Sequence, residues 1–139
     1  GLASSVDYCY ATKHAAVKLS ELAVGIGPFV VGPACERKLG LAGMSDLAIN
    51  ATEWRSAEWA FQRGLYNDIF EDAAAMDEAI EALVGRLLTK SVPAMRGLKK
   101  VFWEGTEHWG ALLAERAAIS GELILSREAK DAINAFKKK

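Results

Sequence analysis

Apolar residues recur at helical spacing throughout the second half of the chain. Between Met76 and Leu88 they fall three and four positions apart, with charged residues on the opposite side, which is the pattern of an amphipathic helix. Pro93 interrupts this pattern, and Ser91 is placed to cap the helix that follows. More apolar stripes occupy residues 95–102, 112–124 and 129–136. We therefore predict three or four helices whose apolar faces pack against other parts of the protein.

The first half of the chain combines short strands with short helices. Residues 7–12 and 16–19 predict two short strands, and residues 65–70 are a later extended segment. Pro28 suits the first position of a helix and Gly40 the position after its end, which predicts a helix over residues 28–39. Further helices are expected at residues 41–49 and from Ser56 to Gly64. Because two strands alone are marginal in water, the pattern indicates an α/β layer that the chain enters partway through.

The composition is that of a folded domain with no excess of positive charge. The chain has 139 residues, of which 51% are hydrophobic and 25% charged, and this excludes the composition of disordered proteins. There are 17 basic and 18 acidic residues, so the formal net charge of -1 lacks the signature of nucleic-acid and polybasic membrane binders. No apolar run reaches the roughly 18–20 residues that cross a bilayer. We expect neither nucleic acid nor a membrane as a partner.

Cysteine and histidine give no sign of a metal or redox site. Cys9 and Cys35 lie far apart and form no C-x-x-C motif, so we expect two buried apolar side chains. His14 and His108 have no ligand-type neighbours in the sequence. The sequence also starts without a charged segment followed by an apolar one. We therefore predict a cytoplasmic protein without a metal.

Four tryptophans, Trp54, Trp59, Trp103 and Trp109, all lie in the part of the chain that is predicted to be helical. Large aromatic side chains fill either a core or a subunit interface. A position in the core is the default expectation for each of them.

One carboxylate stands out by its surroundings. Glu21 follows an apolar approach and precedes a stretch rich in glycine and proline that runs from Gly25 to Pro33. Taken alone, Glu21 is most simply a surface-turn residue, because glutamate side chains are mostly exposed. A chemical role is favoured instead by the order of the motifs that flank it.

Five stretches form an ordered set of motifs. A small apolar segment leads to Asp7 ahead of a predicted strand, and a strand with an acidic loop covers residues 17–22. A G-x-x-P element spans residues 25–28, and an alanine-rich stretch followed by a G-L motif covers residues 51–70. A helix of small residues with paired basic residues lies at 91–101. In this order, over nearly the whole chain, the motifs resemble the second half of a crotonase-superfamily protein, of the enoyl-CoA hydratase and isomerase family.

The resemblance implies a fold and a division of the chain. The expected fold class is α/β, the C-terminal part of a crotonase (ClpP-like) fold, with a few short strands and then a mostly helical C-terminal region. Residues 1–70 would belong to the α/β core, and residues 71–139 would form the helical region used for oligomerisation. A homo-oligomer, either a trimer or a dimer of trimers, is the assembly that the family implies.

The resemblance also implies a site for an acyl-CoA thioester. Glu21 takes the place of the family's general acid/base. The residues in the place of its substrate-binding segment are Gly25, Ile26, Pro28 and Phe29. Phe136 and Lys137 match the aromatic and basic residues that hold coenzyme A, although a core anchor and a solvent-facing lysine explain them equally well. Coenzyme A arrives as part of the substrate, so no separate cofactor is expected.

Two departures from the family pattern leave three functions open. Gly1 stands where many hydratases carry a first glutamate, which favours an isomerase that moves a proton with one glutamate. The run from Phe29 to Pro33 resembles that of branched-chain, methylglutaconyl-type hydratases, which favours hydration of an enoyl-CoA, the preferred prediction. The two backbone donors for the thioester oxygen would precede Gly1. The 139-residue chain alone is therefore expected to be incomplete, and could also be a catalytically silent helical assembly module.

Overall fold

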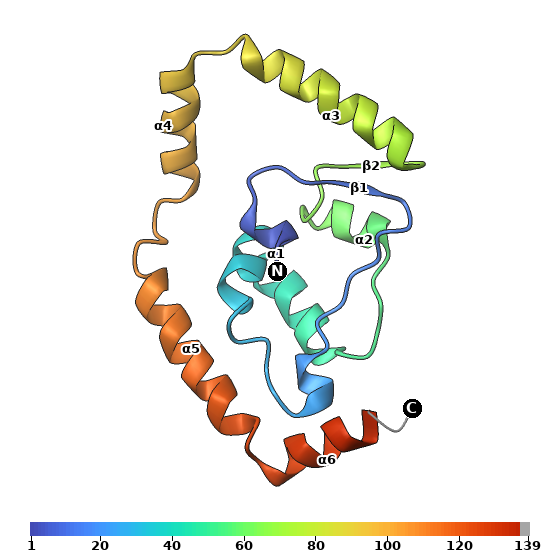
Figure 1. Ribbon diagram of the computed structural model, residues 1–139, viewed down its shortest axis with the longest axis vertical. Coiled ribbons are helices and arrows are strands. Elements are labelled where there is room, and N and C mark those ends of the chain that lie inside the picture. The colour runs from blue at the N-terminus through green and yellow to red at the C-terminus, as the bar shows by residue number, and fades with distance from the viewer. Residues whose placement is uncertain (137–139) are drawn as a thin grey trace.

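The computed structural model describes residues 1–136, which form an inner part and a band of helices around it (Figure 1). The inner part holds the strands and the helices up to residue 70, and the band starts at residue 73 and runs around its rim. The predicted division into functional regions at residue 70 stays a prediction. The elements are, in order, η1 (Ala3–Ser5), β1 (Tyr10–Thr12), η2 (Glu21–Val24), α1 (Gly32–Ile49), α2 (Ala57–Gln62), β2 (Asp68–Phe70), α3 (Ala73–Leu88), α4 (Val92–Phe102), α5 (Trp109–Leu123) and α6 (Arg127–Phe136).

The sheet consists of β1 and β2, which run parallel and pair Tyr10 with Asp68 and Thr12 with Phe70. The pairing continues at one end, where the backbone N–H of Asn67 donates to the carbonyl oxygen of Cys9 over 2.7 Å. The rings of Tyr10 and Phe70 meet edge to face at 5.0 Å, an arrangement that stabilises cross-strand pairs. β1 and β2 thus occupy parts of the extended segments predicted at residues 7–12 and 65–70.

The prediction of a second strand at residues 16–19 is wrong. Only Val17 pairs there, in an isolated antiparallel bridge to Arg55 with hydrogen bonds of 2.9 and 2.8 Å. The backbone N–H groups of Ala15 and Ala16 donate instead to the nearby carbonyls of Thr12 and His14. These turn bonds occupy the groups that a strand ladder would need.

Helix α1 begins later than predicted and joins two predicted helices. Pro28 lies before it, and Pro33 takes the place near the helix start because proline needs no N–H partner there. Gly40 has φ 68° and ψ 167°, which lies outside the helical region and puts a kink inside α1. The predicted boundary between residues 39 and 41 is therefore a kink in one helix.

The buried core lies almost entirely in the inner part. Its members come from β1, α1, α2 and the segments next to them: Ala11, Leu19, Cys35, Leu39, Leu47, Ala57, Ala60, Leu65 and Tyr66. The hydroxyl of Tyr66 donates to the carbonyl oxygen of Ala15 over 3.0 Å, which satisfies its polar end. Cys35 is buried, as predicted, whereas Cys9 is only half-buried.

None of the four tryptophans is fully buried, contrary to the default expectation of core positions, although Trp59 packs against the core. Trp54 is 61% exposed, and Trp59, Trp103 and Trp109 are half-buried. Basic groups lie over the rings of three of them: Lys18 over Trp54 at 4.7 Å, Arg63 over Trp59 at 5.8 Å, and Arg37 over Trp103 at 4.3 Å. Cations favour the faces of indole rings, so these tryptophans sit where the inner part meets charge and solvent.

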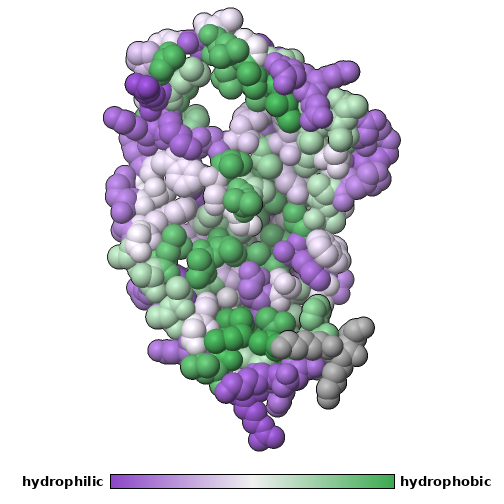
Figure 2. Space-filling model, in the orientation of Figure 1, coloured by the Kyte–Doolittle hydropathy of each residue, from purple (hydrophilic) through white to green (hydrophobic). Residues whose placement is uncertain are grey.

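Helices α3 and α4 of the band have side-chain caps, of which the one at Ser91 was predicted, but the band helices are little buried. Asp72 and Ser91 accept hydrogen bonds from the backbone N–H groups of Ala75 and Ala94 at the starts of α3 and α4. α3 contacts the sheet and α6 contacts η2, while no residue of α3, α4 or α5 is fully buried. Figure 2 shows apolar surface over the end of the molecule where α3 and α4 meet. None of the helices within residues 1–136 is long and apolar enough to cross a membrane.

An ion pair between Asp46 and Arg55 ties α1 to the segment that carries the bridge to Val17. Arg55 donates from Nε and Nη2 to the two carboxylate oxygens over 3.1 and 2.6 Å. The hydrogen bonds from Arg55 lower the pKa of Asp46, and those from Asn50 add to the effect. A carboxylate whose pKa is lower in the folded state stabilises the fold above its unfolded pKa of about 3.9. This stabilisation is lost as the pH falls through the lower folded-state value.

We expect Asp46→Asn to lower the Tm by no more than about 4 °C at pH 7, because partly exposed ion pairs contribute little. The difference in Tm between Asp46→Asn and wild type should shrink as the pH falls below about 3.9. It should vanish once the pH is below the folded-state pKa of Asp46. Thermal unfolding at a series of pH values measures it. Asp131→Asn is the control, because Asp131 forms an exposed ion pair in which its Oδ2 lies 3.7 Å from Nε of Arg127. A difference that stays constant from pH 7 to pH 2 would contradict the assignment.

Candidate functional site

Glu21 is the first residue of the short helix η2, and its backbone holds the turn that follows. Its carbonyl oxygen accepts the N–H of Ile26 over 3.0 Å and that of Gly25 as well. Gly25 ends η2 with φ 76°, a left-handed conformation in which glycine has no Cβ penalty. Glu21, Gly25 and Ile26, all predicted from the sequence, therefore belong to one tight turn.

The carboxylate of Glu21 has a buried oxygen without a partner. The side chain as a whole is half-buried, and its Oε2 is shielded from solvent with no hydrogen bond among the residues that the structure describes. Buried polar atoms in folded proteins nearly always have a partner, so this oxygen is available to a group that the described residues do not supply. Within residues 1–136, this is the one buried side-chain oxygen or nitrogen that remains without a hydrogen bond.

Helix α6 fixes the turn from the other side. Ala129 is fully buried, and a Cβ built on Gly25 would lie 2.9 Å from its Cα. Such a distance leaves no room for any side chain at Gly25, so the two backbones touch directly. The sequence places Ala129 in an apolar stripe, but it gives no sign that this alanine packs against the turn that carries Glu21.

Pro28 and Phe29 line a cavity of about 560 Å³ between α1 and α5. Gly27 leaves room for the ring of Phe29, since a Cβ on Gly27 would lie 2.5 Å from that ring. The other lining residues are Gly32, Pro33, Glu36, Arg37, Met44, Ala48, Trp109, Leu112 and Arg116. Gly25 and Ile26 are not among them. The predicted substrate segment thus divides into two residues that shape the turn of Glu21 and two that face this cavity.

The lining residues of α5 were not identified from the sequence as part of a site. Trp109, Leu112 and Arg116 occupy one face of α5, at spacings of three and four positions. The one signal in the sequence is this spacing, which predicts a shared helix face but not what the face covers.

Phe136 faces a second cavity, of about 570 Å³, close to the segment of Glu21. The residues that line it are Lys18, Ser20, Ala23, Val24, Ala51, Thr52, Ala132, Ala135 and Phe136. Three of them, Ser20, Ala23 and Val24, lie within or next to η2. Phe136 is 75% exposed, so it is not a core anchor. Lys137, its predicted companion, lies outside the described residues.

Gly1 lies beside a third and smaller cavity, of about 250 Å³. A Cβ on Gly1 would be 3.4 Å from Cγ1 of Val31, which is ordinary contact. No group of three or more possible metal ligands occurs in the part of the chain that the structure describes. Glu21 itself is a half-buried carboxylate, and its neighbours in the sequence line the two large cavities, Ser20, Ala23 and Val24 one of them and Pro28 and Phe29 the other. A carboxylate is a group that can transfer a proton.

The chain is similar to a known family and to solved structures of the same fold. A family model described as enoyl-CoA hydratase/isomerase matches residues 1–139, while a comparison with curated proteins finds no match. Among solved structures, an enoyl-CoA hydratase/isomerase from Pseudoalteromonas atlantica T6c is 22% identical with a TM-score of 0.86. OdaA from Pseudomonas aeruginosa is 26% identical with a TM-score of 0.85, and carnitinyl-CoA hydratase from Mycobacterium avium is 23% identical with a TM-score of 0.80.

The chain spans about half the length of these relatives. Each comparison covers 99% of this chain but only 55%, 56% and 54% of the three solved chains, in the order given. Their likeness confirms the predicted fold class, a few short strands followed by a mostly helical region, which is the C-terminal part of a crotonase fold. The family model extends over the full sequence. The chain therefore belongs to the enoyl-CoA hydratase/isomerase family.

Proposed function

We propose that the protein containing this chain adds water to the double bond of an enoyl-CoA thioester, with Glu21 as the general acid/base. The observation that carries the proposal is the buried oxygen of Glu21, which has no hydrogen-bond partner among the described residues. A carboxylate that moves a proton to or from a substrate needs an oxygen free to approach it. The turn at Gly25 and the packing of α6 against it supply a fixed position for that oxygen.

The chemistry of thioesters explains the need for such a group. Addition of water to the conjugated double bond passes through enolate-like charge on the thioester oxygen. Hydrogen-bond donors fixed on that oxygen stabilise the charge, and this is often the largest catalytic contribution. A positioned carboxylate then transfers the proton, which typically contributes about 10²–10⁴-fold to the rate. In this proposal Glu21 transfers the proton, and the donors come from the part of the protein that precedes Gly1.

The cavities provide room for both ends of the substrate. The cavity next to Pro28 and Phe29 offers the acyl group apolar side chains such as Phe29, Met44 and Leu112. Three charged side chains, those of Glu36, Arg37 and Arg116, also line it. The cavity next to Phe136 suits part of coenzyme A, because Lys18 supplies a cation among its lining residues. Lys137 stays a candidate from the family resemblance alone. Coenzyme A then enters as part of the substrate, and the reaction needs no further cofactor. A cytoplasmic location belongs to the same proposal.

Isomerisation of a 3-enoyl-CoA is the second candidate. Gly1 favours it, because a hydratase with two glutamates would carry one of them at that position. An isomerase needs only one carboxylate, which takes a proton from one carbon and returns it to another. Glu21 fits this role as well as the role in hydration.

Product analysis with the full-length protein separates the two activities. A 2-enoyl and a 3-enoyl thioester of the same chain length are supplied in separate reactions, and the products are identified by mass and retention time. We expect a 3-hydroxyacyl thioester from the 2-enoyl substrate. Conversion of the 3-enoyl thioester to the 2-enoyl thioester without any hydroxyacyl product would instead establish the isomerase. No turnover of either thioester would overturn both candidates.

A homo-oligomer is part of the proposal, because apolar side chains of α3 and α4 such as Leu88, Val92 and Val101 are more than half exposed. Exposed apolar patches of this kind are typical of association surfaces. The chain on its own would then be an assembly module without activity. Light scattering on the isolated chain tests this, and a monomer that hydrates a thioester would contradict it.

A further inference from the structure

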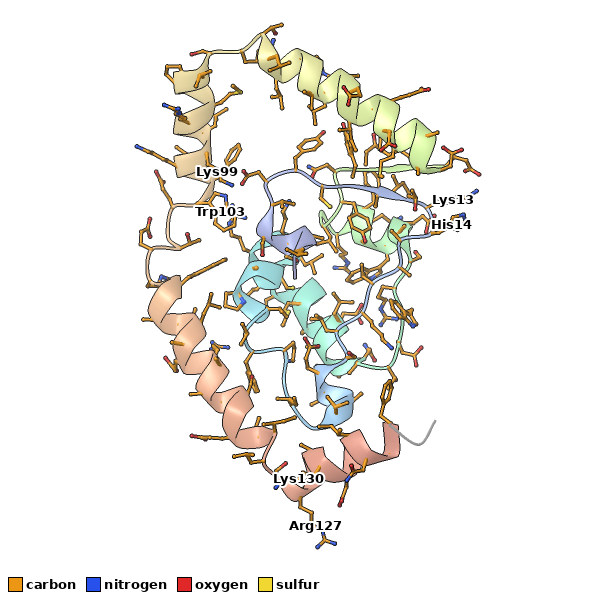
Figure 3. All side chains as sticks on the ribbon, viewed as in Figure 1. Lys13, His14, Lys99, Trp103, Arg127 and Lys130 are labelled. Carbon is orange, nitrogen blue, oxygen red and sulfur yellow. The ribbon has the colours of Figure 1, made fainter. Side chains whose placement is uncertain are left out.

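The α4–α5 corner (residues 99–109) is held to the inner part by a small polar cluster. Asp7 lies at its centre, and its carboxylate accepts from Lys99 Nζ over 2.6 Å and from Trp103 Nε1 over 2.5 Å. Figure 3 shows Lys99 and Trp103 together at the end of α4, on the side nearest the inner part. We call Asp7, Arg37, Lys99 and Trp103 the Asp7 cluster.

Arg37 joins the cluster from α1. Its guanidinium lies 4.3 Å from the ring centre of Trp103, and its Nη2 donates to the carbonyl oxygen of Phe102. Lys38, the next residue, donates from Nζ to the carbonyl oxygen of Asp7 over 3.3 Å. The start of α1, the segment of Asp7 and the corner are therefore linked by charged hydrogen bonds, which are stronger than neutral ones.

The cluster matters because apolar burial does little to hold the corner. None of the residues in α4 or α5 is fully buried, and Phe102, Leu98 and Val101 are each at least half exposed. Desolvation alone would raise the pKa of Asp7, but the hydrogen bonds from Lys99 and Trp103 and the nearby charges of Lys99 and Arg37 lower it. Asp7 is thus a carboxylate at neutral pH and keeps both bonds.

The cluster also leads directly to the cavity beside Pro28 and Phe29. The ring of Trp103 meets that of Trp109 edge to face at 5.9 Å. Trp109 opens α5 and lines the cavity with Leu112, while Arg37 lines it from α1. Two members of the Asp7 cluster therefore either line this cavity or touch a residue that does.

We propose that Asp7 is a positioning residue, which anchors the α4–α5 corner and thereby sets the distance between α5 and Pro28 and Phe29. The proposal rests on the proposed function, because the cavity it shapes is the one assigned to the acyl group. Asp7 touches no substrate in this account. It acts through Trp103 and Trp109 on the far wall of the cavity, where a long acyl group ends.

The test replaces Asp7 by asparagine and Trp103 by phenylalanine in the full-length protein. Asp7→Asn keeps the shape of the side chain and removes its charge, whereas Trp103→Phe keeps an aromatic ring, is smaller, and removes the indole N–H that Asp7 accepts. The kcat and KM are measured for 2-enoyl thioesters of increasing acyl length. We expect KM to rise about tenfold for the longer acyl groups and less than about twofold for the shortest, with kcat for the shortest nearly unchanged.

Asp46→Asn is the matched control. The side chains of Asp7 and Asp46 are 30% and 28% exposed, and each accepts hydrogen bonds from a basic residue. The control should lower stability without changing the dependence of KM on acyl length. Equal changes of KM at every acyl length in Asp7→Asn would overturn the proposal, since a general loss of structure would explain them.

Amide hydrogen exchange separates this proposal from the proposed function. Asp7→Asn should speed exchange in α4 and in the first turns of α5, and Asp46→Asn should not. If the wild-type protein turns over no thioester, the proposed function fails together with the role of the cavity, and exchange still decides whether Asp7 anchors the corner. Unchanged exchange in α4 and α5 would overturn the anchoring itself.

Discussion

Replacing Glu21 by glutamine should lower kcat/KM for hydration of a 2-enoyl thioester by about 10²–10⁴-fold, the contribution typical of a general acid/base. Glutamine has nearly the same shape, so the turn at Gly25 should form as before and the substrate should still bind. The loss should therefore appear in kcat and leave KM within about threefold of wild type. Steady-state kinetics of the full-length protein measures both constants.

The stability of Glu21→Gln makes this test specific. Since Oε2 of Glu21 has no partner among the described residues, the substitution removes no hydrogen bond from that oxygen, and the Tm should not fall. Glu53→Gln is the control, because Glu53 is an exposed carboxylate that follows Thr52, a residue lining the same cavity as Ser20. A decrease in kcat/KM of less than about tenfold, or an equal decrease in the control, would rule out Glu21 as the proton-transfer group.

Replacing Gly25 by alanine should destabilise the protein by roughly 2–5 kcal/mol, through backbone strain and a collision. The left-handed conformation at φ 76° costs about 1–2 kcal/mol for a residue with a Cβ. The new Cβ would also lie within 3.1 Å of three atoms of Ala129, two of them backbone atoms that cannot move aside without α6. Shifting η2 by about 1 Å would misplace Glu21, which can cost about 10²-fold in activity.

The variant Gly105→Ala separates the cost of the left-handed backbone conformation from the cost of the collision with Ala129. Gly105 has φ 82° and nothing within 4 Å of its Cβ position, so this variant carries the strain alone. Denaturant unfolding should place Gly25→Ala below Gly105→Ala by about 1–3 kcal/mol, the usual cost of overpacking. Ala129→Gly should not restore Gly25→Ala fully, because the Cα and N of residue 129 remain in the way. Equal stability of the two alanine variants would mean that α6 does not press on the turn.

Features of the fold that depend on neighbouring residues could be predicted from the sequence. Ser56 and Ser91 cap helices where their position before an apolar stripe indicates it, and Gly40 marks an interruption because its backbone leaves the helical region. The strand predicted at residues 16–19 failed for the opposite reason. The N–H groups of Ala15 and Ala16 form local turn hydrogen bonds in place of bonds across a sheet. The pattern of apolar residues does not show which of these two kinds of hydrogen bond will form.

The candidate site also combines a part formed by neighbouring residues with parts formed by residues distant in the sequence. Its turn lies within eight residues, from Glu21 to Pro28, and the resemblance to a family gives its parts. The other parts of the site come from α5 and α6. Gly25 contacts Ala129, and Pro28 lines the same cavity as Trp109, so both pairs join residues that are distant in the sequence. A helical stripe shows which residues share a face, whereas the partner of that face depends on how the chain returns on itself.

The Asp7 cluster also sets an order of folding. Asp7 is separated from Lys99 by 92 positions and from Trp103 by 96. Closing loops of this length has an entropic cost that grows with their size, and contacts between such distant residues form late. We expect the β1–β2 pairing and α1 to form before the α4–α5 corner docks. During synthesis on a ribosome, Asp7 emerges long before Lys99 and Trp103 exist, so the first segment of the chain must remain without these partners while the helices of the band are still being made.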